Sequence, residues 1–242
     1  MDKDAGEDRD WWLLVGGRRR LGRELARILA RRHNLVLTTS GSWEPEADFV
    51  SELSKQTQVR CLLWDGSSPG LAQTMMADLA ALGAAGRRLN SCVLVAGTFP
   101  EAPLGQWDAD GLAGTWQVNL TFPLLAAQAV APLLADGGCL QFLLDTAIHR
   151  PFLKHLPYSA AKAGLAAMVP GLARALAPRV RVVGHALGTV LIAGHDPAGL
   201  AAHSLVQAIG TPEDLARALE FAAESPYLTG EVITLDGGTR WA

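Results

Sequence analysis

Short apolar runs alternate with longer stretches of helical spacing along the chain. The apolar runs are continuous, as is typical of strands that helices cover on both faces. They predict seven strands, at residues 11–15, 35–39, 59–64, 92–95, 139–144, 180–185 and 232–235. The stretches between them predict helices at residues 22–32, 45–55, 71–82, 107–134, 158–177 and 212–223.

The alternation of strands and helices favours parallel pairing through right-handed crossovers. We therefore expect an α/β Rossmann fold, a doubly wound, seven-stranded, mostly parallel sheet with helices on both faces. No internal repeat and no linker rich in Pro, Gly or Ser divides the 242 residues, which predicts a single domain over residues 1–242. The least regular segment, residues 188–210, is expected to form a short flap over a site.

Composition narrows the functional classes. A net charge of −3 gives no reason to expect a nucleic-acid binder. No apolar run reaches the roughly 18 residues of a membrane span, and the acidic residues 1–10 are unlike a secretory signal. The three cysteines and six histidines lack the spacing of a disulfide framework or metal site, so we expect a cytoplasmic protein without a metal.

The first predicted strand leads into a glycine-rich turn at residues 15–22, and a helix follows. Glycines let the backbone approach a pyrophosphate, which then lies at the positive N-terminus of the helix. The turn also carries three successive arginines that can pair with phosphates: Arg18, Arg19 and Arg20. A plain strand-to-helix turn with solvated arginines is the alternative, and the position after the first strand favours dinucleotide binding.

The end of the second predicted strand bears on the choice of cofactor. NAD-binding proteins usually carry an acidic residue there for the ribose 2′-hydroxyl, but residues 38–42 contain none. With the arginines of the first turn nearby, this favours NADP. Asp65 and Gly66 follow the third strand, where Asp65 could accept a hydrogen bond from the adenine amino group. An ordinary Asp-Gly turn would explain the same two residues.

Tyr158 and Lys162 are four residues apart and share one face of a predicted helix. A lysine ammonium beside a phenol lowers the phenol's pKa from about 10, so that the tyrosine can deliver a proton near neutral pH. Such a pair is common by chance. Its place after the fifth strand, on the cofactor side of the sheet, gives it significance here.

Together and in this order, the motifs resemble those of the short-chain dehydrogenase/reductase family over essentially the whole chain. Further matches are Ala96-Gly97 after the fourth strand, Asn119 in the long helix, and the ending at residues 228–238. The resemblance implies that Tyr158 is the general acid, that Lys162 lowers its pKa and holds the ribose, and that Asn119 organises a proton-relay water. It also implies a homotetramer, or a homodimer, formed through the helices at 107–134 and 158–176.

With the turns described above, the resemblance predicts an NADP site. The residues that compose this predicted site are Gly16, Arg18, Arg19, Arg20, Leu21, Ser40, Ser42, Asp65, Gly66, Ala96, Gly97, Asn119, Tyr158, Lys162, Gly188, Thr189 and Val190.

The chain departs from the family's usual pattern at informative places. Asp145 stands 13 residues before Tyr158, where the family usually has Ser, and Arg20 occupies a glycine position. One interpretation is decay into a non-catalytic, NADP-binding regulatory protein. The other is the pteridine reductase subgroup, which resembles this chain at both positions and has a Phe beyond strand four, matched by Phe99.

The chemistry of pterin reduction explains why an acidic residue could stand at position 145. Reducing a pterin C=N bond needs hydride at carbon and a proton at nitrogen, and a carboxyl beside Tyr158 can exchange protons with it. The favoured function is therefore NADPH-dependent reduction of a small pteridine-type ring, with Tyr158 as proton donor. The predicted substrate contacts are Arg20, Phe99, Asp145 and Tyr158. A general carbonyl reductase, acting on a ketone or 3-oxoacyl group, is the alternative enzyme.

Overall fold

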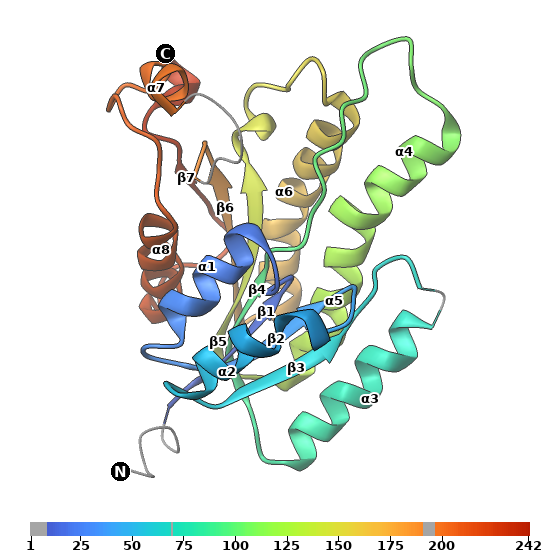
Figure 1. The fold of residues 1–242 in the computed structure, drawn as a ribbon, viewed down its shortest axis with the longest axis vertical. Coiled ribbons are helices and arrows are strands. Elements are labelled where there is room, and N and C mark those ends of the chain that lie inside the picture. The colour runs from blue at the N-terminus through green and yellow to red at the C-terminus, as the bar shows by residue number, and fades with distance from the viewer. Residues whose placement is uncertain (1–8, 69, 191–196) are drawn as a thin grey trace.

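The computed structural model describes residues 9–68, 70–190 and 197–242. Over these residues one sheet has the strand order β3-β2-β1-β4-β5-β6-β7, and every adjacent pair is parallel (Figure 1). This confirms the doubly wound fold, with a sheet that is parallel throughout. The strands are β1 Trp11–Val15, β2 Asn34–Thr39, β3 Val59–Leu63, β4 Leu89–Leu94, β5 Leu134–Asp145, β6 Val180–Leu187 and β7 Val232–Leu235.

Two helical layers cover the sheet (Figure 1). Helices α1, α2 and α8 pack on one face, and α3, α5 and α6 pack on the other. In β1, Trp12 and Leu14 enter the core on the first face while Leu13 and Val15 enter the core on the second. The helices are α1 Arg20–Leu29, α2 Ala47–Ser54, α3 Leu71–Ala84, α4 Ala109–Trp116, α5 Phe122–Val130, α6 Leu156–Leu176, α7 Pro197–Ala202 and α8 Pro212–Glu224.

The prediction of one helix over residues 107–134 was wrong. The structure has α4, a π-helical turn at Gln117–Thr121, α5 and a 3₁₀ turn at Ala131–Leu133, and the next residue already begins β5. At the π turn, the Asn119 side chain donates to the backbone oxygen of Thr115 at 3.0 Å. Because that carbonyl bonds to a side chain, the ladder is locally widened, as is typical of π-bulges near functional sites.

The segment at residues 188–210 contains α7, which the sequence pattern did not predict. Leu200 of α7 lines the same cavity as Thr189 and Val190. Part of the expected flap, residues 191–196, lies outside the described residues. Within the described ranges, no helix is long and apolar enough to cross a membrane.

Candidate active site

A cavity of about 900 Å³ opens beyond the carboxyl ends of the strands, where β1 and β4 lie side by side and the chain order reverses. Ligands of doubly wound sheets bind at this switch point. Two predicted residues, Ser42 and Asn119, are absent from the lining. The predicted residues that line it are Gly16, Arg18, Arg19, Arg20, Leu21, Ser40, Asp65, Gly66, Ala96, Gly97, Phe99, Asp145, Tyr158, Lys162, Gly188, Thr189 and Val190.

The first turn is tightly packed backbone. Gly16 has φ +100°, and a Cβ there would lie 2.8 Å from the backbone nitrogen of Ala96. A Cβ on Gly22 would lie 2.0 Å from the Gly16 oxygen, so the start of α1 is held against the turn. Arg20 also has a left-handed φ, +48°, which explains why glycine can stand at that position in the family. The turn therefore offers the close backbone approach that a pyrophosphate needs.

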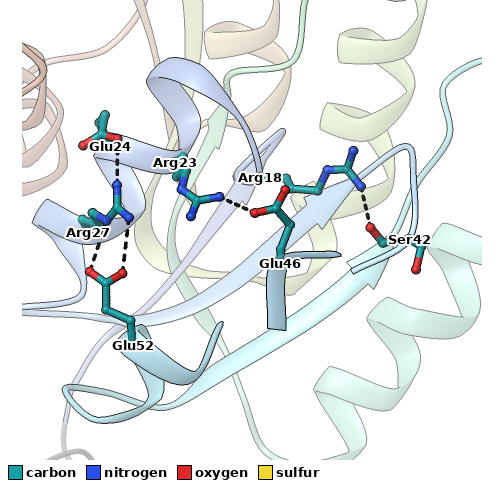
Figure 2. Close-up of polar contacts among 7 residues, drawn as sticks. All are labelled: Arg18, Arg23, Glu24, Arg27, Ser42, Glu46 and Glu52. Carbon is teal, nitrogen blue, oxygen red and sulfur yellow. Dashed lines mark hydrogen bonds and ion pairs between the residues drawn. The ribbon is translucent and has the colours of Figure 1, made fainter. Parts of the chain in front are cut away.

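Arg18 belongs to the turn after β1, and its side chain points toward Ser42, in the segment that follows β2 (Figure 2). It is 9% exposed, donates through Nη1 to the backbone oxygen of Ser42, and lies against Gly41. Its Nε has no hydrogen-bond partner among the described residues, although Arg18 lines the cavity. A buried donor without a partner is costly, so this geometry fits an anion beside the end of β2.

Ser42 lies outside the cavity lining and its backbone oxygen anchors Arg18, so its contact with the cofactor stays a prediction. Two ion-pair groups hold the same connection against α1 (Figure 2). Arg23 pairs with Glu46 and Arg27 with Glu52 at 3.1 Å, whereas the pair of Arg27 with Glu24 at 2.9 Å lies within α1. Partly exposed pairs of this kind contribute about 0–1 kcal/mol each.

Asp65 takes part in a turn stabilised by its own side chain, which is the alternative that the Asp-Gly sequence left open. Its Oδ1 accepts hydrogen bonds from the backbone nitrogen of Ser67 at 3.0 Å and from the Ser67 hydroxyl at 2.7 Å. These bonds hold the pKa of Asp65 below its usual value. The residue also lines the cavity, so the adenine contact stays a prediction.

Tyr158 and Asp145 form a hydrogen-bonded pair inside the cavity. The Tyr158 hydroxyl donates to Asp145 Oδ2 at 2.9 Å, and Asp145 Oδ1 accepts from the Ala147 nitrogen at 2.8 Å. Burial raises the pKa of Asp145 above its usual value. Burial and the Asp145 carboxylate also raise the pKa of Tyr158, which corrects the expectation of a lowered value. The phenol thus keeps its proton at neutral pH.

Lys162 is buried one helical turn beyond Tyr158. Its Nζ donates to the backbone oxygen of Leu143 at 2.9 Å and lies 5.7 Å from the centroid of the Tyr158 ring. Burial lowers the pKa of Lys162 to about 8. At that distance the ammonium can stabilise a phenolate that forms during proton transfer, although it does not set the resting pKa of Tyr158.

Asn119 lies behind the cavity wall. It is buried, its Oδ1 accepts from the Thr98 nitrogen at 3.1 Å, and its Nδ2 donates to the Thr98 hydroxyl at 3.2 Å. A Cβ on Gly97 would lie 3.0 Å from Asn119 Oδ1 and 3.7 Å from Lys162 Nζ. Asn119 therefore positions the turn after β4, and its predicted contact with the cofactor stays a prediction.

Phe99 is half exposed and lines the cavity, with its ring edge-to-face to that of Tyr158 and the two centroids 4.8 Å apart. The sequence pattern did not reveal its other neighbours, Phe152 and His155, because the loop after β4 and the loop before α6 carry no periodic signal. Leu200 and Thr239 of the lining were missed for the same reason. Among the described residues, no group of His, Cys, Asp and Glu could hold a metal ion.

A family model described as Enoyl-(Acyl carrier protein) reductase matches residues 16–240. The chain belongs to the short-chain dehydrogenase/reductase family. It is thus an oxidoreductase of a family that uses nicotinamide cofactors.

Relatives within the short-chain dehydrogenase/reductases carry two different activities in their names. Carbonyl reductase family member 4 of Danio rerio is 29% identical over 236 residues, covering 94% of this chain and 97% of the relative. Dihydromonapterin reductase of Escherichia coli (strain K12) is 28% identical over 236 residues, covering 93% and 95%. Among solved structures, a blue fluorescent protein from a metagenomic library, in complex with NADPH, is 25% identical with a TM-score of 0.84, covering 95% of this chain and 97% of that one.

Proposed function

We propose that this chain is an NADPH-dependent reductase of a C=N bond in a pteridine-type ring, with Tyr158 as the proton donor. The observation that carries the proposal is the hydrogen bond of 2.9 Å between the Tyr158 hydroxyl and the Asp145 carboxylate. A site that reduces a carbonyl needs a neutral donor to the substrate oxygen, whereas a carboxylate would repel a developing oxyanion. The likeness to a dihydromonapterin reductase supports the same choice.

The residues of the first turn and of β2 fit NADP. Arg18 offers a buried cation with a partnerless Nε beside the end of β2, and residues 38–42 hold no acid that would repel a 2′-phosphate. The likeness to a protein solved with NADPH supports the assignment. When bound, the cofactor supplies a hydride to the substrate carbon. Lys162 and the backbone of the glycine turn would hold its ribose and pyrophosphate.

The chain's own residues manage the proton. Tyr158 keeps its proton at neutral pH because burial and Asp145 both raise its pKa. In the reaction the hydroxyl gives that proton to the ring nitrogen, and the phenolate left behind lies near the Lys162 ammonium. The existing hydrogen bond between Asp145 and the Tyr158 hydroxyl is the path along which the carboxyl group can return a proton to Tyr158 after each turnover.

The substrate ring would lie beside Phe99, which lines the cavity and contacts Tyr158 edge-to-face. Offset stacking on an aromatic side chain suits a flat heterocycle. Arg20, at the end of the glycine turn, lines the same cavity and can donate to an oxygen on the ring.

A general carbonyl reductase is the second candidate, because the chain is also similar to a carbonyl reductase. The two functions are separated by measuring NADPH oxidation with dihydropteridines, oxidised pterins, quinones, simple ketones and a 3-oxoacyl thioester. The proposal expects turnover of a pteridine with the highest kcat/KM in the panel. Turnover of ketones or thioesters alone would replace it with the carbonyl function.

We also propose a homotetramer, or a homodimer, in a reducing cytoplasm. Exposed apolar side chains on three helices support the assembly: Trp116 of α4, Leu125 of α5 and Met168 of α6. The three cysteines are free thiols, which suits a reducing compartment. Sedimentation analysis of the purified protein tests the assembly, and a monomer at micromolar concentration would contradict it.

A further inference from the structure

The His155 imidazole supports one face of the Phe99 ring. It stacks on that ring with centroids 3.8 Å apart and planes 15° apart. Phe99 remains 50% exposed and lines the cavity, whereas His155 is not among the lining residues. The imidazole therefore covers one face of Phe99 while the rest of the side chain stays accessible.

His155 is itself held in place by short hydrogen bonds. Its ring Nδ1 lies 2.8 Å from the backbone oxygen of Pro100, and its backbone nitrogen donates to Phe152 at 2.8 Å. Ala102 forms an isolated bridge with His155, and the Ala102 nitrogen donates to the Lys154 oxygen at 2.7 Å. The loop after β4 is thereby fastened to the loop before α6.

The same short segment also positions the proton donor. Helix α6 begins at Leu156, immediately after His155, and Tyr158 lies in its first turn. The Ser159 nitrogen and hydroxyl both donate to the His155 backbone oxygen, at 2.9 Å and 3.0 Å. His155 thus connects the aromatic wall of the cavity to the residue that carries the chemistry.

We propose that His155 is a positioning residue, which fixes Phe99 as a flat wall so that the site selects planar aromatic rings over acyclic carbonyl compounds. This inference rests on the proposed function and names a specificity device within it. A half-exposed ring on a loop loses rotational freedom when a substrate stacks on it. Because the imidazole already restricts the ring, less of that entropy is lost on binding.

Three substitutions separate stacking from hydrogen bonding. His155→Ala removes both, His155→Phe keeps a ring against Phe99, and His155→Asn keeps a donor near Pro100 without a ring. We expect His155→Ala to raise the Kd of a diaminopteridine for the NADP-loaded protein by about 2- to 12-fold, the size of one aromatic contact. His155→Phe should restore most of the affinity, and His155→Asn little.

Kinetics distinguish positioning from a catalytic role. In His155→Ala the KM for the pteridine substrate should rise while kcat changes by less than about twofold, because binding is lost equally in the ground and transition states. In a Phe99→Ala background, His155→Ala should have no further effect. The matched control is His149→Ala, whose imidazole contacts Thr234 at 3.2 Å and Arg240 at 3.2 Å and should leave the Kd unchanged.

The inference is overturned if His155→Ala lowers the affinity as much in the Phe99→Ala background as in the wild type. It is also overturned if His155→Phe does not restore the affinity. If the wild-type protein binds no pteridine, the proposed function fails, and a separate readout then decides the role of His155. Fluorine NMR of protein labelled with para-fluorophenylalanine reports on Phe99, whose signal is identified by its loss in Phe99→Leu. His155→Ala should shift that signal, since the stacked imidazole is gone. An unchanged signal would contradict the proposal that His155 positions Phe99.

Discussion

Replacing Asp145 with Ser restores the residue that the family usually carries, and it should move activity from pterins toward ketones. In the structure the Asp145 carboxylate accepts from the Tyr158 hydroxyl at 2.9 Å and from the Ala147 nitrogen at 2.8 Å. A serine hydroxyl is shorter than the carboxylate and has no acid-base pKa near neutral pH, so it cannot act as the proton reservoir for Tyr158. Loss of general acid–base catalysis typically costs roughly 10²–10⁴-fold in rate, or about 3–5 kcal/mol in the barrier.

The pH profile gives this prediction a second readout. The phenolate that forms during proton transfer needs the Lys162 ammonium, whose pKa is about 8, so the rate should fall as pH rises through that pKa. The Asp145 charge raises the pKa of Lys162, and its removal should therefore shift the alkaline limb of the profile to lower pH. The assay is NADPH oxidation with a dihydropterin and with a ketone across the pH range, using wild type, Asp145→Ser and the near-isosteric Asp145→Asn.

The expected result is a kcat/KM for the dihydropterin that falls by roughly 10²-fold or more in both variants, while ketone turnover rises in Asp145→Ser. Thermal melting of each variant at the assay pH serves as the control for folding. Unchanged pterin reduction together with an unmoved alkaline limb would refute the reasoning, because the carboxyl would then be only a cap on the Ala147 nitrogen.

Three further predictions follow from other groups. Arg18→Ala should weaken NADPH binding in fluorescence titrations while leaving NADH unchanged, and an equal loss for both would contradict a 2′-phosphate contact. Tyr158→Phe should lower kcat by roughly 10²–10⁴-fold, and a near wild-type kcat would exclude it as the acid. Burial lowers the pKa of His185 to about 4, so stability should fall by about 3 kcal/mol as pH drops from about 6.5 through 4. Urea unfolding of wild type and His185→Asn checks this, and the variant should lose that dependence.

The sequence was sufficient for most of the sheet because the central strands β1, β2, β4 and β6 are buried on both faces. In β1, alternate side chains enter different cores, so the strand reads as one apolar run. The start of β5 was missed because residues 135–138 are Ala-Asp-Gly-Gly, a turn-like sequence. There the pairing of Leu89 with Leu134 and a bond from the Gly137 nitrogen to the Arg179 oxygen extend the strand, and both are tertiary contacts.

In the candidate site too, some residues could be placed from the sequence, while other features depend on tertiary contacts. Residues fixed by strand ends and helix spacing, such as Gly16, Tyr158 and Lys162, could be placed from the sequence, and the structure brings them into one cavity. The resemblance already placed Asp145 beside Tyr158, but the raised pKa of Tyr158 depends first on its burial, which residue spacing does not report. The stacking of His155 on Phe99 joins two loops 56 positions apart in sequence.

The central claim is that this cavity is built for a pteridine ring, and one titration tests it most directly. Calorimetry of a diaminopteridine added to the NADP-saturated protein measures its binding to the cavity that Phe99 lines, and it does not require turnover. We predict saturable binding of one diaminopteridine per chain, with a lower affinity in Phe99→Ala. The absence of any binding at about millimolar ligand, with the protein folded and NADP bound, would contradict it.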